Sequence, residues 1–329
     1  MKAIVSLLLL WGVSNSLHFA FCQSGDQVTP SIKVTTIGSL DTIQTGFSFT
    51  EGPAVDKQGN VFFTDQPNDR IYRWDAVTEA ITVFLEGAGR ANGMAFDQDG
   101  YLIACADMHG ELWKIAPDGS HEVLINHYNG KLLNGPNDLW INPLTGDIYL
   151  TDPLFPRAYW NDDDPRKQAW PPTHSEQAET GKGGHVYYLA PESKALIRVT
   201  EGWDADAWPN GIVGTPDGKK LYVNKWAGGN MGGIWVFDIM ENGTLSLGRK
   251  FSDTGGDGMS MDELGNIYIS NASGVVVLDP NGNQILTIDP GGGATNNVFA
   301  GQDGKTLFIT GPTDRVTKVQ MNVSGVEKF

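Results

Sequence analysis

From about residue 50 to its end, the chain alternates short apolar runs with glycine turns. The runs are rich in β-branched and aromatic residues, and an amide or carboxylate side chain stands at the head of each of six repeats. These six positions are Glu51, Asn92, Asn137, Asn210, Asp257 and Asn296. Each lies eight residues before a turn glycine, or nine in the third repeat, and successive positions are 41, 45, 73, 47 and 39 residues apart. Self-similarity at about 40 to 50 residues between glycine turns predicts a β-propeller.

Every repeat also carries a third and a fourth strand-like run, as in residues 70–74 followed by 80–85. Four strands in each of six repeats predict an all-β fold, a six-bladed β-propeller with four-stranded blades. The sixth repeat runs out of chain near Phe329, and residues 32–37 are available to supply its missing outer strand. We therefore expect residues 23–329 to form one closed ring and a single domain.

The third repeat is irregular, because its spacing of 73 leaves extra residues at about 153–183. Tryptophan and proline alternate with charged residues in this insertion, which includes Trp160, Trp170 and His174. Such a composition predicts a folded loop, either a flap beside the channel mouth or a partner-binding loop. His174 is expected to be exposed to solvent rather than catalytic.

Propeller geometry brings the six head positions together. The first strand of each blade lines the central channel, so equivalent positions at the starts of six first strands form a ring around one axial mouth. Two carboxylates and four amides in that ring predict an axial metal site for a hard cation, and Ca²⁺ accepts this mixture of oxygens. Thiolate and imidazole are absent from the six positions, which argues against zinc. The alternative is that asparagine and aspartate recur because they favour turns, although turn chemistry would not select Glu51.

Charge excludes one class of partner. The formal net charge is −16, whereas binding nucleic acid requires clustered lysine and arginine. Acidity alone identifies no other partner. The usual catalytic signatures are also missing, since the chain has no Gly-x-Ser-x-Gly elbow and no phosphate loop. Residues 97–100 look like the start of a calcium-binding EF-hand loop, but the same Asp-Gly pattern recurs at other repeats and predicts a hairpin turn.

The first 22 residues differ from the rest. Lys2 precedes an apolar stretch too short for a comfortable membrane span, so residues 1–22 resemble a secretory signal peptide and predict a secreted or periplasmic protein. No transmembrane segment is then expected in the mature chain. Cys22 weakly resembles a lipid attachment site, but Phe21 stands where a small residue is expected. Removal of the signal would leave Cys105 as the one cysteine, without a disulfide and most simply explained as a core residue.

Four short motifs follow one another at blade spacing, and together they carry a family resemblance. They are Phe-Thr-Glu-Gly-Pro at 49–53, Asn-Gly-Pro-Asn-Asp-Leu at 134–139 with Leu-Thr-Asp-Pro at 150–153, Pro-Asn-Gly-Ile at 209–212 and Gly-Asp-Gly-Met at 256–259. The chain resembles the family that contains gluconolactonases, regucalcin and, more distantly, the paraoxonases. This resemblance implies a six-bladed propeller with an axial divalent cation, usually Ca²⁺, and hydrolysis of lactones.

The resemblance also implies roles for individual residues. Glu51, Asn210 and Asp257 match the family's central metal ligands, and Asn137 matches a position that binds metal in some members and substrate in others. With a lactone carbonyl polarised by the cation, Asp257 would activate a water as general base, or would only hold the metal. Further candidates for substrate binding are Asn92, Asn296, Arg90 and His109.

Departures from the family pattern narrow these expectations. Asn92 stands where paraoxonases carry a catalytic histidine, so the chain is closer to the gluconolactonases and a sugar lactone is the expected substrate. Mg²⁺, Mn²⁺ and Zn²⁺ remain alternatives to Ca²⁺. A non-catalytic binding propeller tied together by Ca²⁺, or a propeller hydrolase of another ester class, would share the same ring. The sequence does not indicate an oligomeric state.

Overall fold

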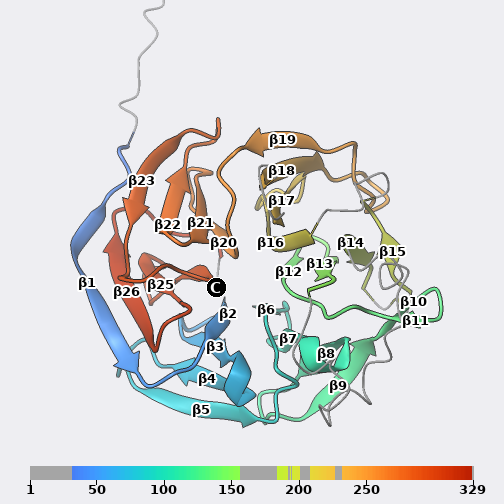
Figure 1. Cartoon of the computed structure of the whole chain (residues 1–329), viewed down its shortest axis with the longest axis horizontal. Coiled ribbons are helices and arrows are strands. Elements are labelled where there is room, and N and C mark those ends of the chain that lie inside the picture. Colours follow the sequence, from blue (N-terminus) through green and yellow to red (C-terminus); the bar gives the residue numbers. More distant parts are fainter. Residues whose placement is uncertain are drawn as a thin grey trace, which may run out of the picture. The chain divides into compact units, whose positions relative to one another are not determined.

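Six four-stranded antiparallel sheets surround a central axis in the computed structural model (Figure 1). The structure describes residues 32–155, 184–191, 193, 195–200, 208–226 and 232–327. The unit Val34–Phe329 contains all six sheets. The predicted six-bladed propeller is confirmed.

In each of blades one to five, chain order runs from the innermost strand outward. The first three blades are β2 (Thr50–Val55), β3 (Val61–Asp65), β4 (Arg70–Trp74) and β5 (Ile81–Glu86); β6 (Met94–Phe96), β7 (Leu102–Ala106), β8 (Glu111–Ile115) and β9 (His121–Ile125); and β12 (Leu139–Ile141), β13 (Ile148–Pro153), β14 (Gly184–Leu189) and β15 (Ile197–Arg198). The next two are β16 (Trp208–Gly214), β17 (Lys220–Trp226), β18 (Gly233–Asp238) and β19 (Arg249–Ser252); and β20 (Met259–Met261), β21 (Ile267–Asn271), β22 (Gly274–Leu278) and β23 (Gln284–Ile288).

The sixth blade joins the two ends of the described chain. Its strands are β24 (Asn297–Ala300), β25 (Thr306–Ile309), β26 (Arg315–Met321) and, outermost, β1 (Thr36–Thr45). A small hairpin, β10 (His127–Tyr128) with β11 (Lys131–Leu132), and two 3-10 helices, η1 (Gln66–Asn68) and η2 (Asp107–His109), complete the described elements. The described part of the chain has no helix that is long and apolar enough to cross a membrane.

The N-terminal segment closes the ring as the sequence predicted, but the predicted bounds were wrong. Residues 32–37 were expected to form the outer strand of the sixth blade, whereas the strand is β1, which pairs antiparallel with β26. Only Thr36 and Ile37 belong to both ranges. β1 is mostly exposed and lacks a clear apolar pattern. The buried apolar residues that indicate a strand here, Val34 and Phe47, lie on either side of it.

The hydrophobic core lies between neighbouring blades. Phe62 of the first blade packs in one cluster with Ala104 and Trp113 of the second, and Trp74 packs with Phe308 of the sixth. Each sheet is therefore buried on both faces by its neighbours, and an open ring would leave two apolar faces exposed to water.

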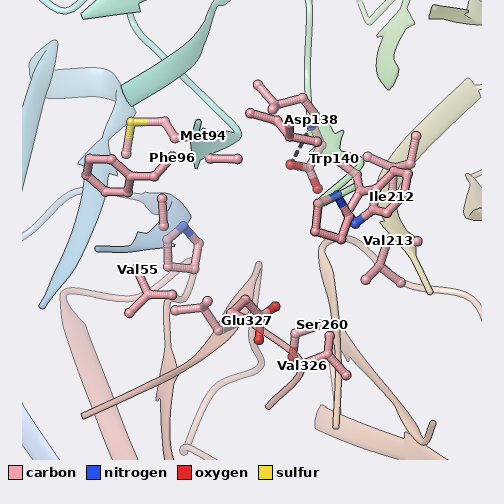
Figure 2. A pocket seen from close by; sticks show the side chains of 18 of the residues that line it. Val55, Met94, Phe96, Asp138, Trp140, Ile212, Val213, Ser260, Val326 and Glu327 are labelled. Atoms are coloured by element: carbon pink, nitrogen blue, oxygen red, sulfur yellow. Dashed lines mark hydrogen bonds between the residues drawn. The ribbon is translucent and has the colours of Figure 1, made fainter. Parts of the chain in front are cut away.

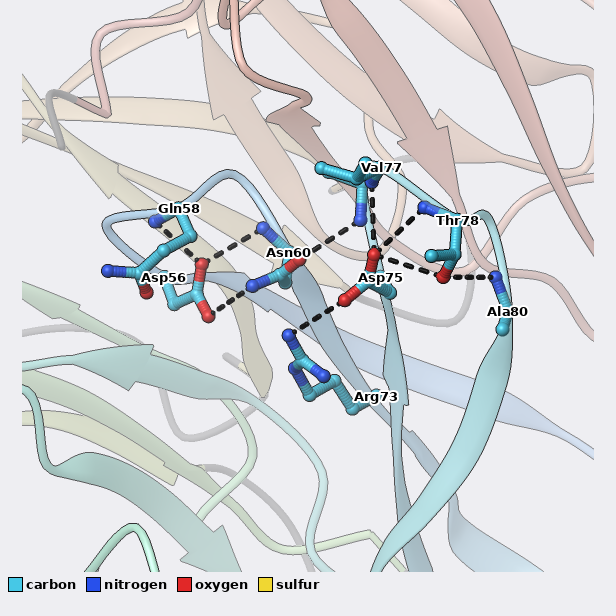
Figure 3. Close-up of polar contacts among 9 residues, drawn as sticks. Asp56, Gln58, Asn60, Arg73, Asp75, Val77, Thr78 and Ala80 are labelled. Atoms are coloured by element: carbon cyan, nitrogen blue, oxygen red, sulfur yellow. Dashed lines mark hydrogen bonds and ion pairs between the residues drawn. The ribbon is translucent and has the colours of Figure 1, made fainter.

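The turn that follows an inner strand is held by a repeated aspartate. In the first blade, Asp56 Oδ1 accepts the backbone N–H groups of Gln58 and Asn60, both at 2.9 Å, and its Oδ2 accepts the Asn60 side chain at 2.8 Å (Figure 3). Asp97 accepts the equivalent backbone donors in the second blade and forms a hairpin turn between β6 and β7. The prediction of a turn rather than an EF-hand loop is confirmed.

Two predicted segments lie outside the described residues. These are the signal peptide of residues 1–22 and most of the insertion, residues 156–183, with Trp160, Trp170 and His174. The insertion connects β13 to β14 within the third blade. Cys105 is a buried free cysteine in β7, and burial raises the pKa of its thiol, which fits the predicted core role.

Candidate metal centre and active site

Each inner strand carries a β-bulge at the same level of the propeller. In the second blade, Asn92 N–H donates to the Cys105 carbonyl at 2.9 Å, while Cys105 N–H donates to the next carbonyl, that of Gly93, at 3.0 Å. Two consecutive residues thus oppose one residue of the second strand, which is the definition of a bulge. Register shifts after Glu51 and after Pro209 mark the same feature in the first and fourth blades.

The bulges define two stacked layers of six positions. The first position is occupied by Glu51, Asn92, Asn137, Asn210, Asp257 and Thr295, and the second by Gly52, Gly93, Asp138, Gly211, Gly258 and Asn296. Five of the six predicted ring residues are therefore equivalent. Asn296 is not, because Thr295 N–H donates to the Thr310 carbonyl at 3.1 Å and Asn296 supplies the carbonyl of the second position. The sequence pattern placed Asn296 one residue out of register.

Hydrogen bonds join neighbouring bulges at three junctions around the axis. Gly93 N–H donates to the Asn137 carbonyl at 2.6 Å, and Gly258 N–H donates to the Thr295 carbonyl at 2.8 Å. Thr295 Oγ1 donates to the Thr50 carbonyl at 2.6 Å, which joins the sixth blade to the first. Hydrogen bonds thus tie neighbouring bulges together at these three junctions, and the strands position the side chains of the ring.

The glycines of the second layer leave no room for a side chain. A Cβ at Gly52 would lie 1.8 Å from the Asn92 carbonyl oxygen, and one at Gly211 would lie 2.2 Å from that of Asp257. Glycine is required here because the inner strands approach one another at backbone distance. Asp138 is the one carboxylate in this layer, and its Oδ1 accepts the Leu139 N–H at 2.9 Å.

Burial and like charge raise the pKa values of the axial carboxyl groups. The pKa of Glu51 lies well above its usual value, mainly because the side chain is buried, and the charges of Asp257 and Asp138 act in the same direction. Burial raises the pKa of Asp138 to about 7, and Asp257 again adds to the effect. The Asn296 side chain hydrogen-bonds to both carboxyl groups and lowers their pKa values. Three carboxyl groups are therefore close enough to influence one another.

Asp138 was missed as a site residue by the sequence reasoning, which counted two carboxylates. The available signal was its position directly after Asn137, where four of the other blades have glycine. Asn296, which was predicted to bind substrate, accepts the Asn297 N–H at its Oδ1 at 2.8 Å. Its amide N–H group is thus the donor available to the Glu51 and Asp138 carboxyl groups.

The donor set fits a hard divalent cation. Buried carboxyl groups that raise one another's pKa values are stabilised by a positive charge between them, and carboxylate and amide oxygens are the ligands that Ca²⁺ accepts. Within the described ranges, no three His, Cys, Asp or Glu side chains form a metal-binding group on their own. A cation at this ring would therefore require amide oxygens beside Glu51 and Asp257, as the Asn137 and Asn210 positions provide.

A cavity lies on the side of the ring where the inner strands begin. This cavity, here termed the entry cavity, has a volume of about 790 Å³ and contains Asp257 in its wall. The other described lining residues include Phe49, Lys225, Asp253, Asn271 and Thr295. Lys225, Asp253 and Asn271 were not singled out from the sequence, because their approach to Asp257 depends on the fold.

A second cavity, the axial channel, lies on the other side of the ring. It has a volume of about 350 Å³ and is lined by the inner strands and by the chain segment at Val326 and Glu327. Figure 2 shows Asp138 and Glu327 extending into this channel among apolar side chains such as Phe96 and Trp140. Asp138 and Asn296 form the end nearest the ring.

The other predicted substrate contacts, Asn92, Arg90 and His109, are not among the described residues that line these two cavities. Asn92 is buried at the first bulge position. Arg90 has a left-handed backbone, with φ at +49°, and its N–H donates to Asp69 Oδ1 at 2.6 Å. His109 ends η2 and stacks on Trp113 with ring centroids 5.6 Å apart. Neither Arg90 nor His109 belongs to the described lining of the entry cavity.

Fold and ring together define a class of six-bladed propellers with an acidic axial site. A model of the SMP-30/gluconolactonase/LRE-like region matches residues 49–313, most of the sequence, and the chain belongs to this family. The resemblance noted in the sequence motifs is confirmed.

The relatives of the chain include enzymes and a calcium-binding protein. A gluconolactonase of Zymomonas mobilis is 28% identical over 314 residues, which cover 87% of this chain and 82% of that protein. The solved structure of a gluconolactonase from Xanthomonas campestris matches with a TM-score of 0.73 and 28% identity, covering 87% of this chain and 91% of that one. Regucalcin of Agrobacterium tumefaciens, described as a calcium-binding protein, shares the fold with a TM-score of 0.67 at 17% identity, covering 87% and 95%.

Proposed function

We propose that this protein is a lactone hydrolase that depends on a divalent cation, with Ca²⁺ as the favoured ion and a gluconolactone-like sugar lactone as the substrate. The observation that carries the proposal is the buried ring, in which burial and the charge of Asp257 raise the pKa values of Glu51 and Asp138 beside amide side chains. Membership of a family with gluconolactonases among its members supports the reaction class.

Glu51, Asn210, Asp257 and Asn137 would hold the cation, since all four occupy the first layer of the ring. When bound, a divalent cation supplies a Lewis acid that polarises a carbonyl oxygen. Its charge would also offset the repulsion among the carboxyl groups. Asp138, in the second layer, would add negative charge from the channel side.

The chain's own residues can then carry out the rest of the hydrolysis. Asp257 lines the entry cavity and is the carboxylate positioned to accept a proton from an attacking water. The water oxygen bonds to the carbonyl carbon, the bond from that carbon to the ring oxygen breaks, and the proton accepted by Asp257 passes to the ring oxygen, so the product is the open hydroxy acid. Thr295 and Asn271 line the same cavity and can hydrogen-bond to sugar hydroxyl groups.

The test is hydrolysis of glucono-1,5-lactone by the purified protein, followed as acid release above the spontaneous rate. We expect catalysis in Ca²⁺, loss of catalysis in a chelator, and loss of at least about a hundredfold in Asp257→Ala. A hydrolysis rate that is unchanged both by the chelator and by the Asp257→Ala substitution would contradict the proposal. Calcium-dependent melting with no turnover of any lactone would instead identify a binding propeller.

A further inference from the structure

The Thr-Asp pair near the end of β13 belongs to a motif that the proposed function leaves without a role. Thr151 contacts the ring itself, because its carbonyl accepts the Asn137 N–H at 2.8 Å and its Oγ1 accepts the Asp138 N–H at 3.0 Å. Asp152 comes next and is only 1% exposed. Burial of a carboxylate is costly unless hydrogen bonds compensate its charge.

The Asp152 carboxylate holds the segment that leads into Asn137. Its Oδ2 accepts the Asn134 N–H and its Oδ1 accepts the Gly135 N–H, both at 2.9 Å. Burial raises the pKa of Asp152 to about 7, and these two hydrogen bonds lower it, so they favour the ionised form. Gly135 has φ at +148°, and a glycine gives the chain many other conformations when nothing holds it. Asn137 is thus fixed from upstream by Asp152 and across the strand pair by Thr151.

The first blade repeats this arrangement at Glu51. Asp65 is fully buried and comes one residue after Thr64, the strand partner of Glu51. Its Oδ1 accepts the Phe49 N–H at 3.1 Å. Phe49 stands two residues before the ring position, as Gly135 does in the third blade. The other four blades have no carboxylate at the equivalent position, where they carry Ala106, Lys225, Asn271 and Gly311. The carboxylate therefore accompanies two particular ring positions and is not a general requirement of the blades.

We propose that Asp152 is a positioning residue for the axial site, which fixes the backbone before Asn137 and so holds the Asn137 side chain where it binds the cation. This inference rests on the proposed function for the cation, but it is measured by calcium binding without turnover. One competing explanation is that Asp152 only stabilises the fold. Another is that its negative charge attracts the cation directly. Neither of these acts through Asn137.

The experiment measures Ca²⁺ affinity by calorimetry in a double-mutant cycle of Asp152→Asn and Asn137→Ala at pH 8. Asparagine keeps the size of the side chain but offers one acceptor oxygen for two N–H donors. We expect Asp152→Asn to weaken Ca²⁺ binding at least about tenfold when Asn137 is present, and less than about twofold when it is alanine. Equal weakening in both backgrounds, or no weakening in either, would overturn the inference.

Asp262→Asn is the matched control for a merely structural role. Asp262 is fully buried, and its Oδ1 accepts the backbone N–H groups of Leu264 and Asn266, both at 2.9 Å. It follows β20, and neither described cavity lining includes it. The substitution should lower the melting temperature while Ca²⁺ affinity stays within about twofold of wild type. A loss of affinity as large as that of Asp152→Asn would show that destabilisation alone weakens the ring, against the inference.

Asp152→Glu is the second variant, because it keeps the charge and displaces the carboxylate oxygens by one methylene. It should weaken Ca²⁺ binding at least about threefold, and only while Asn137 is present. Wild-type affinity would show that charge rather than position matters, and the inference would fail. Amide hydrogen exchange of the metal-free protein adds a readout without cation or substrate. Exchange at residues 134–138 should be at least about tenfold faster in Asp152→Asn and unchanged in Asp262→Asn.

Turnover separates this inference from the proposed function. Ca²⁺ affinity that depends on Asp152 through Asn137, with no hydrolysis of any lactone, would overturn the proposed function alone. Calcium-dependent hydrolysis with a Ca²⁺ affinity that is indifferent to Asp152 would overturn the inference alone. Failure of the wild-type protein to bind Ca²⁺ would overturn both.

Discussion

At the scale of single residues, the axial carboxyl groups oppose folding when no cation compensates them. Glu51 and Asp138 have raised pKa values because they are buried and because Asp257 lies close to both. Like charges at a buried site lower the free energy of unfolding. A cation that binds only the folded chain raises the free energy of unfolding by more than this repulsion lowers it. The same residues should therefore affect stability in opposite directions with and without metal.

Asp257→Asn tests this reversal. In a chelator, the variant should unfold at a temperature a few degrees above that of wild type, because removal of one charge relieves about 1 kcal/mol of repulsion. In Ca²⁺ the order should reverse, since the variant loses most of the stabilisation by the ion. Calorimetric melting with and without Ca²⁺ measures both. Asp253→Asn, which removes a carboxylate from the same cavity, is the control and should keep the full calcium effect.

Glu327 offers a residue-scale prediction away from the ring. Its Oε2 is buried in the axial channel and has no hydrogen-bond partner among the described residues, and burial raises the pKa of Glu327 to about 7. The folded chain therefore binds this proton more tightly than the unfolded chain, and stability falls as pH rises from about 4.5 to about 7. The full difference in pKa between the folded and unfolded chain corresponds to a loss of about 3 kcal/mol in the free energy of unfolding, as an upper estimate.

Glu327→Gln should remove this contribution. Urea unfolding at pH 5 and pH 8 should show the variant close to wild type at the lower pH and more stable by roughly 1 to 3 kcal/mol at the higher pH. The comparison isolates Glu327 because other buried carboxyl groups are common to both proteins. A difference that is the same at both pH values would contradict the assignment.

At the scale of elements, the bulges of the inner strands decide which side chains reach the axis. Gly52 has φ at +49° and lies where a Cβ would be 1.8 Å from the Asn92 carbonyl oxygen. Gly52→Ala should therefore destabilise the protein by about 3 kcal/mol or more and weaken calcium binding, as measured by urea unfolding and calcium titration.

Gly87→Ala separates steric crowding from backbone strain. Gly87 also has a positive φ, +70°, but a Cβ there would meet nothing within 4 Å. Its cost should be limited to about 1 kcal/mol, with calcium binding unchanged. Equal losses for the two variants would show that crowding between inner strands plays no part.

Strand positions were predictable from the sequence, but the bulge register of the sixth blade was not. β4 begins and ends where the apolar run of residues 70–74 does. Counting eight residues back from the turn glycine Gly304 selects Asn296. The inner strand of the sixth blade, β24, has four residues, however, whereas the inner strands β6, β12 and β20 have three. One additional residue shifts the head position to Thr295. Such a shift depends on backbone pairing and leaves no trace in residue type.

At the scale of the whole molecule, six apolar layers between blades require the ring to close. Repeats at blade spacing carried enough information to predict this closure, because each repeat needs a neighbour on both faces. Contacts between side chains that only folding brings together could not be predicted from the sequence. The charge of Asp257 acts on Asp138, and Lys225 and Asp257 line the same entry cavity. These contacts turn a repeated pattern into an asymmetric site.

The most direct test of the account is a crystal structure of the protein grown with Ca²⁺, with the ion located by its anomalous signal. We predict one ion in the axial ring, held by Glu51, Asn210 and Asp257, with Asn137 facing it. The fold places these residues in the first layer of the ring, so no rearrangement of the blades should accompany binding. A ring without calcium at millimolar concentration of the ion, or an ion bound only elsewhere, would contradict the central claim.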